Sequence, residues 1–167
     1  RNIYIYGFEL FWSTTFCIIS ILALGAIFGY LSMAVMFLLF FIPVRFPAGG
    51  YHAKSYGRCF ILTNSVAIAC VAVSRLLWSI ENAEWIMWIL LLLSLVYIWI
   101  NSPVQSAGHP LRPERISKNR IYAHVLLGIE LVILLLFRSI DNSCVIYTGI
   151  VASWAVAIMI ALAKKGG

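Results

Sequence analysis

Residues 83–101 read AEWIMWILLLLSLVYIWIN, an almost uninterrupted apolar segment. A helix needs about 20 apolar residues to cross the roughly 30 Å hydrocarbon core of a bilayer. The segment has this length, and its single charged residue, Glu84, stands next to its start. It therefore predicts a transmembrane helix.

The composition of the whole chain also indicates a membrane protein. Of its 167 residues, 63% are hydrophobic and 11% are charged. Soluble domains have roughly 45–50% apolar and about 25% charged residues. This excludes a soluble globular protein, a disordered chain and a secreted disulfide scaffold. The length suits one compact unit, so we expect residues 1–167 to form a single transmembrane domain.

Apolar runs along the chain predict an all-α, polytopic membrane protein with about six transmembrane helices. The expected spans are 8–24, 28–44, 59–78, 83–101, 120–138 and 143–163. Because proline interrupts helical hydrogen bonding, we expect Pro43 and Pro47 to end the second span. For the same reason, Pro103, Pro110 and Pro113 should keep 102–119 out of a regular helix.

The net charge of +6 is distributed unevenly between the gaps. Basic residues gather in the 43–58 and 102–119 loops and at the C-terminus, so we expect these segments to face the cytoplasm. Their separation along the chain excludes a continuous nucleic-acid-binding surface. The chain begins with Arg1 rather than Met, so we expect preceding sequence, and no cleavable signal peptide is evident.

The most informative loop is PVRFPAGGYHAKSYGRCF, at residues 43–60. It places His52 seven residues before Cys59, with Arg58 beside the cysteine. A nucleophilic thiol needs a base to take its proton and positive potential to favour the thiolate. His52 suits the first role, and Arg58 together with a helix N-terminus suits the second. On these residues alone, two alternatives stay open: a metal site, and a polar loop without a catalytic role.

Two segments resemble the AgrB family, the accessory gene regulator B membrane cysteine peptidases. They are RFPAGGYHAKSYGRC at 45–59 and SPVQSAGHPLRPER at 102–115. The resemblance implies a peptidase that cuts the C-terminal tail from an AgrD-type precursor and helps to close a quorum-sensing thiolactone. It makes His52 the base and Cys59 the nucleophile of a His-Cys dyad. Arg45 and Gly50 fall on positions that the family motif emphasises.

The expected partners are the AgrD-type precursor and the lipid bilayer, without nucleic acid, and a homodimer stays open. Lys54 and Arg115 are candidates for steering an acidic precursor tail by electrostatic attraction. The resemblance also implies a multi-pass protein of the bacterial cell membrane whose active site lies on the cytoplasmic side. We expect neither a cofactor nor a metal. The alternative function is a small membrane transporter or export component, which leaves the His52–Cys59 loop unexplained.

A metal-dependent protease or sensor using His52, Cys59 and His109 is a further alternative, although no His-Glu-x-x-His motif is present. His109 is also an alternative base.

Several intramembrane residues have structural interpretations. Cys17 and Cys70 are expected to pack as small apolar residues. Asn64 and Ser65 suit either helix packing or a role beside the catalytic pair. Glu130 should have a partner, since a carboxylate inside a membrane is costly, and Arg75 and Arg138 are the candidates.

Overall fold

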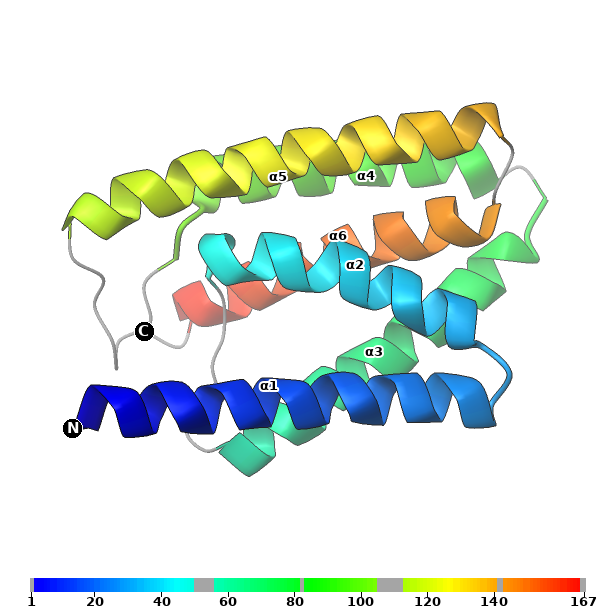
Figure 1. Cartoon of the computed structure of the whole chain (residues 1–167). Coiled ribbons are helices and arrows are strands. Elements are labelled where there is room, and N and C mark those ends of the chain that lie inside the picture. The colour runs from blue at the N-terminus through cyan, green and yellow to red at the C-terminus, as the bar shows by residue number, and fades with distance from the viewer. Residues whose placement is uncertain (1, 50–55, 82, 105–112, 141–142, 166–167) are drawn as a thin grey trace.

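The computed structural model describes residues 2–49, 56–81, 83–104, 113–140 and 143–165. Six helices follow one another along these residues (Figure 1). They are α1 (Asn2–Ile27), α2 (Leu31–Ala48), α3 (Tyr56–Trp78), α4 (Ala83–Asn101), α5 (Pro113–Ser139) and α6 (Ser143–Lys165). The described residues contain no β-strand, only one isolated bridge. The predicted all-α fold is confirmed.

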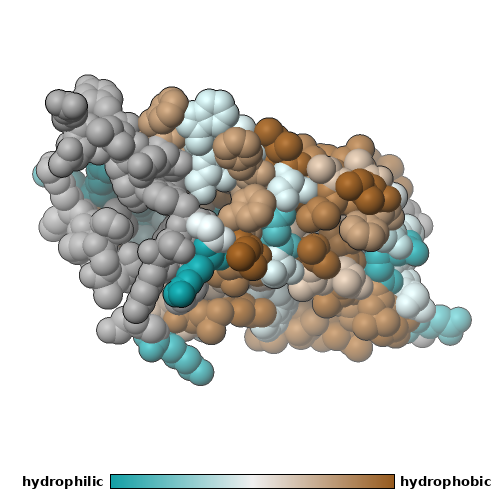
Figure 2. Space-filling model, turned by 90° about the horizontal axis from the view of Figure 1, so that it is seen from below, coloured by the Kyte–Doolittle hydropathy of each residue, from teal (hydrophilic) through white to brown (hydrophobic). Residues whose placement is uncertain are grey.

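Helices α2 to α6 are each long and apolar enough to cross a bilayer. The first expected span falls on α1, whose apolar part, Phe11–Ile27, is shorter. Hydrophobic side chains cover much of the face that includes α1 and α3 (Figure 2). Such a surface is stable in lipid and unstable in water, so the chain is a multi-pass membrane protein.

Helix α6 is the central element of the bundle. It packs against α2, α3, α4 and α5, and most of its residues are buried. Its small residues allow this close approach. A Cβ added at Gly149 would lie 2.7 Å from Leu134 Cδ2 and 3.2 Å from Phe40 Cζ, so a larger residue there would require these two side chains to shift.

The expected effect of the prolines was wrong in two places. Helix α2 continues through Pro43 and Pro47 to Ala48, and α5 begins at Pro113 rather than after residue 119. Proline is tolerated inside membrane helices because neighbouring helices and local adjustments satisfy the freed carbonyl groups. At the first position of a helix, its missing N–H has no intrahelical partner to lose. Both loops are therefore shorter than predicted.

We call the end of the bundle where α2, α4 and α6 finish and α3 and α5 begin the loop end (Figure 1). The described basic residues at the loop end are Arg45, Arg58, Arg115, Lys118, Arg120, Lys164 and Lys165. The opposite end mixes Arg75 and Arg138 with Glu81 and Glu84. This is the charge asymmetry expected from the sequence, and the cytoplasmic location of the loop end stays a prediction.

Candidate active site

Cys59 lies in the first turn of α3, which begins at Tyr56. This agrees with the expected start of the third membrane helix close to Cys59. The residue is half-buried, and its carbonyl oxygen accepts a hydrogen bond from Thr63 Oγ1 at 2.9 Å. The first turn of a helix has unpaired N–H groups and the positive end of the helix dipole. Both features stabilise negative charge at this position.

Arg45 lies in the last turn of α2, and its side chain lies near Cys59 of α3. Its guanidinium carbon lies 5.3 Å from the centroid of the Phe41 ring. The Arg45 charge also interacts electrostatically with the thiols of Cys59 and Cys17. The fold thus brings together Arg45 and Cys59, two site residues that the sequence places on different helices.

Cys17 joins this cluster from α1, and its proximity to Cys59 was not foreseen. Cys17 packs against the core as expected, and it also interacts electrostatically with both Cys59 and Arg45. A signal for this position was available in the sequence. Cys17 and Ser20 are three residues apart, so they share one helix face that can meet polar residues of a neighbouring helix.

Asn64 connects α1 with α3 beneath Cys59. Its side-chain oxygen accepts a hydrogen bond from Ser20 Oγ at 2.9 Å. Its amide nitrogen donates to Phe60 O at 2.9 Å and to Cys17 Sγ at 3.7 Å. The two amide hydrogens are therefore both engaged. Of the two interpretations of Asn64, helix packing is the one that these contacts support.

The other predicted site residues are distributed differently. His52, Gly50 and Lys54 lie outside the described residues, as does His109. Arg58 lies exposed in the first turn of α3, next to Cys59 in sequence. Arg115 is exposed in the first turns of α5, and Figure 1 places the start of α5 on the opposite side of α2 from the start of α3. The structure thus groups Arg45 with Cys59 and leaves Arg115 apart from them.

Glu130 has a different partner from those expected. It is buried in α5, and its Oε1 lies within hydrogen-bond distance of Ser153 Oγ on α6. The same hydroxyl lies 3.0 Å from the carbonyl oxygen of Gly149. A neutral hydroxyl on the adjacent helix, rather than Arg75 or Arg138, accommodates the buried carboxyl group.

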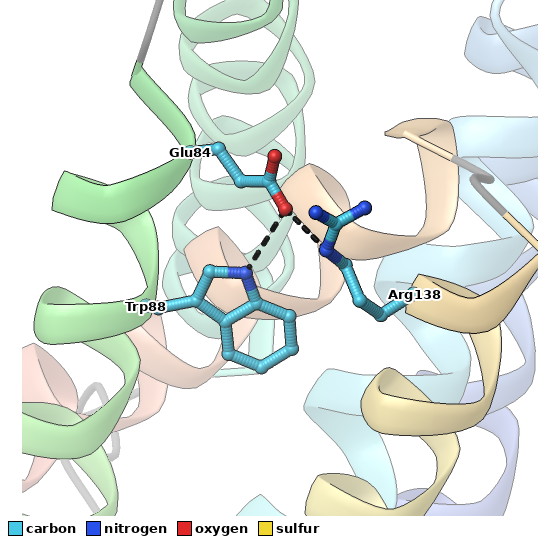
Figure 3. A network of polar contacts seen from close by, with 3 residues as sticks. All are labelled: Glu84, Trp88 and Arg138. Atoms are coloured by element: carbon cyan, nitrogen blue, oxygen red, sulfur yellow. Dashed lines mark hydrogen bonds and ion pairs between the residues drawn. The ribbon is translucent and has the colours of Figure 1, made fainter.

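The two arginines instead make contacts at the opposite end of the bundle. Arg138 Nε lies 2.5 Å from Glu84 Oε1, which also accepts a hydrogen bond from Trp88 Nε1 at 3.4 Å (Figure 3). The Arg75 guanidinium lies over the rings of Tyr30 and Trp78, at 5.3 and 5.6 Å from their centroids. These contacts fix helix ends far from Cys59, so neither arginine belongs to the candidate site.

Within the described parts of the chain, no group of three or more His, Cys, Asp or Glu side chains is arranged to hold a metal ion. The one histidine among the described residues, His124, stacks on Trp99 with ring centroids 3.7 Å apart, and its Nε2 lies 3.1 Å from Trp99 O. These contacts give His124 a packing role between α5 and α4.

These features define a class: a multi-pass helical membrane protein with a cysteine, an arginine and a helix N-terminus grouped at one end of the bundle. The family model for AgrB, accessory gene regulator B, matches residues 1–161, so the chain belongs to the AgrB family. Membership connects it with the accessory gene regulator system of quorum sensing. No curated protein and no solved structure is significantly similar to it.

Proposed function

We propose that this protein is a membrane cysteine peptidase that removes the C-terminal tail of an AgrD-type precursor and helps to form its thiolactone. The observation that supports this most directly is the grouping of Cys59 with the charge of Arg45 at the start of α3. A thiol that must become a thiolate gains from a nearby cation and a helix N-terminus. Membership of the AgrB family supports the same function.

In the first step, His52 takes the proton of the Cys59 thiol. The thiolate attacks the carbonyl carbon of the scissile peptide bond. The C–N bond then breaks, and the departing amine receives the proton from the His52 imidazolium. The products are an acyl-thioester on Cys59 and the free C-terminal tail. This step needs a nucleophile, a base and a stabilised anion, and no metal.

In the second step, the thiolate of a cysteine within the precursor attacks the acyl-thioester. A new C–S bond forms, the bond to Cys59 breaks, and Cys59 leaves as a thiolate. Because one thioester replaces another, the ring closes without ATP. Water is the competing nucleophile, so a site at the membrane edge, where water is scarce, favours ring closure over hydrolysis.

The remaining candidate residues have supporting roles in this proposal. Arg45 and Arg58 supply positive potential near Cys59, and Gly50 gives backbone freedom beside His52. Lys54 and Arg115 steer the acidic tail of the precursor. Arg115 suits steering rather than catalysis, since the start of α5 lies across α2 from the start of α3, which bears Cys59 (Figure 1). The loop end would face the cytoplasm of a bacterial cell, where the precursor is made.

The test uses the full-length protein in vesicles with a synthetic precursor, and it measures release of the tail. We expect Cys59→Ala and His52→Ala each to abolish release, while Cys70→Ala, a buried cysteine of the same helix, retains it. Iodoacetamide should stop the wild-type reaction and a chelator should not. Full cleavage by Cys59→Ala would contradict the proposal, and inhibition by the chelator alone would favour the metal alternative.

A further inference from the structure

A groove of about 510 Å³ runs between the C-terminal half of α2 and the N-terminal half of α5. Ile42, Phe46, Tyr122, Val125 and Leu126 are among the residues that line it. Most of this lining is apolar, and Phe46 is 84% exposed and Tyr122 58% exposed. A groove of this kind at the side of a membrane protein opens toward the hydrocarbon chains of the bilayer.

The groove is separate from Arg45 and Cys59, the described residues of the candidate active site that lie together. Ile42 and Phe46 are four residues apart and so share one face of α2. Phe41 and Arg45 are also four residues apart and share another face, the one associated with Cys59. Pro43 and Pro47 also line the groove. At 3.6 residues per turn, the four lining residues of α2 centre about 150° from Phe41 and Arg45, so α2 stands between the groove and the thiol.

One end of the groove is positively charged. On α5, Arg115 is four residues before Asn119, which lines the groove, and Lys118 is four residues before Tyr122. Residues at this spacing lie above one another on a helix, so both cations continue the lining of the groove toward the loop end. Both are exposed. The groove thus combines an apolar length with a cationic end.

We propose that this groove binds an anionic phospholipid of the surrounding bilayer. An acyl chain lies along Phe46, Tyr122 and Val125, and the phosphate binds Arg115 and Lys118. Arg binds phosphate in bidentate fashion, and Lys adds a point charge. Tyr122 stands between the apolar and charged parts, the position that tyrosine prefers at a membrane interface.

A lipid fits the groove better than an extended peptide does. An extended backbone presents N–H and C=O groups along its whole length, and each loses its hydrogen bonds to water on entering apolar surroundings. Among the residues that line the groove, the polar side chains are those of Asn119 and Tyr122. An acyl chain has no such requirement, and its one charged group lies at the end where the cations are.

The experiment uses the full-length protein, purified in mild detergent with equal amounts of palmitoyl-oleoyl phosphatidylglycerol and palmitoyl-oleoyl phosphatidylcholine. Native mass spectrometry measures which lipid stays bound. We expect the wild type to retain the anionic phosphatidylglycerol in preference to phosphatidylcholine. Each cation near an anionic headgroup contributes about fivefold, so Arg115→Gln with Lys118→Gln should weaken retention by roughly 25-fold.

The matched control is Arg120→Gln with Lys165→Gln, which removes the same charge from the loop end. Arg120 follows Asn119 directly, so it points away from the groove, and Lys165 belongs to α6. We expect this control to keep the preference. A third variant, Val125→Trp, fills the groove and should lower retention with every cation in place.

Three results of the retention measurement would overturn the inference. They are equal retention of both lipids by the wild type, equal losses in the two double variants, and undiminished retention by Val125→Trp. Displacement of the lipid by a precursor peptide would overturn it as well and assign the groove to the peptide. Since the measurement records bound lipid and not cleavage, its failure leaves the proposed peptidase function untouched.

Discussion

The backbone amide of Val104 donates a hydrogen bond to the carbonyl oxygen of Ala48 at 2.9 Å. Gly49 and Val104 also pair in an isolated parallel bridge. This contact joins the end of α2 to the segment that follows α4. The residues that lead into the His52 loop are therefore hydrogen-bonded to the residues that lead into the loop after Val104, although more than fifty residues separate them in the sequence.

Gly49 has a conformation that favours glycine at this junction. Its φ is 77° and its ψ is −159°, a region that residues with a Cβ rarely adopt. A Cβ at this position would also collide with the carbonyl oxygen of Val104. Any larger residue must therefore shift the backbone that leads into the His52 loop.

Gly49→Ala is expected to destabilise the protein by about 1–3 kcal/mol, the usual cost of holding a residue in such a conformation. It should also slow tail cleavage, because the segment bearing His52 is displaced. Thermal unfolding in detergent measures the first effect, and peptide release in vesicles measures the second. Gly57→Ala is the control, since a Cβ there meets no atom within 4 Å. Unchanged unfolding and cleavage in Gly49→Ala would show that the bridge is dispensable.

Arg45→Gln should slow the alkylation of Cys59, because it removes a positive charge that interacts with this thiol. The measurement needs a background in which Cys17, Cys70 and Cys144 are replaced by alanine. We expect the second-order rate constant of alkylation at fixed pH to decrease.

Arg45→Lys is the informative control for this charge. It keeps the positive charge but loses the planar guanidinium that lies over Phe41. Intermediate alkylation by Arg45→Lys would agree with an electrostatic role. If Arg45→Gln reacts as fast as the parent, Arg45 supports the local fold and not the thiolate.

Glu130→Gln is expected to leave stability almost unchanged, whereas Glu130→Leu should cost about 1–2 kcal/mol. Ser153 Oγ has one hydrogen and two nearby acceptors, Glu130 Oε1 and Gly149 O. If that hydrogen is donated to Gly149, the acid form of Glu130 completes the network by donating to Ser153. The amide of glutamine can make the same donation, and leucine cannot.

A double-mutant cycle with Ser153→Ala tests this network, because contacting residues show non-additive effects. Ser94→Ala is the matched control, since that buried hydroxyl donates to Leu91 O, 2.8 Å away within its own helix. Infrared spectroscopy should detect a protonated carboxyl group that Glu130→Gln lacks. Equal destabilisation by Glu130→Gln and Glu130→Leu would rule out the donation.

Much of the fold was predictable because each segment that enters lipid must satisfy its backbone hydrogen bonds within itself, and this depends on local sequence. A run of apolar residues such as 83–101 must become a helix in a bilayer, whatever its neighbours are, since its backbone has no other hydrogen-bond partners. The helix containing Cys59 was foreseen for a similar reason. Pro43 and Pro47 were misjudged because their effect depends on adjacent helices, which a linear pattern does not reveal.

The contacts of the candidate site, like those of the buried Glu130, depend on tertiary packing, and this explains why the sequence did not predict them. The partner of Glu130 is a serine 23 residues away, and Cys17 meets Arg45 and Cys59 through the packing of α1 on α2 and α3. The spacing of Cys17 and Ser20 indicates a shared helix face, but no spacing in the sequence identifies Arg45 and Cys59 as neighbours of Cys17 or Ser153 as the partner of Glu130. The relation of His52 to Cys59 lies outside the described residues, so the proposed dyad remains a prediction.

The orientation of the bundle can be tested with cysteines placed at its two ends. In a variant whose four native cysteines are replaced by alanine, we introduce Glu81→Cys or Lys118→Cys. Both positions are exposed, the first beyond the end of α3 and the second in the first turns of α5. The measurement is labelling of intact cells with a membrane-impermeant maleimide, followed by labelling after permeabilisation.

We expect Glu81→Cys to react in intact cells and Lys118→Cys to react only after permeabilisation. The reason is the excess of Lys and Arg at the loop end, since short basic segments are retained in the cytoplasm. Comparable labelling of both variants after permeabilisation is the control for access to the two thiols. Labelling of Lys118→Cys from outside intact cells would reverse the orientation. It would also separate Cys59 from a precursor made in the cytoplasm, so the proposed peptidase would then require prior transport of its substrate.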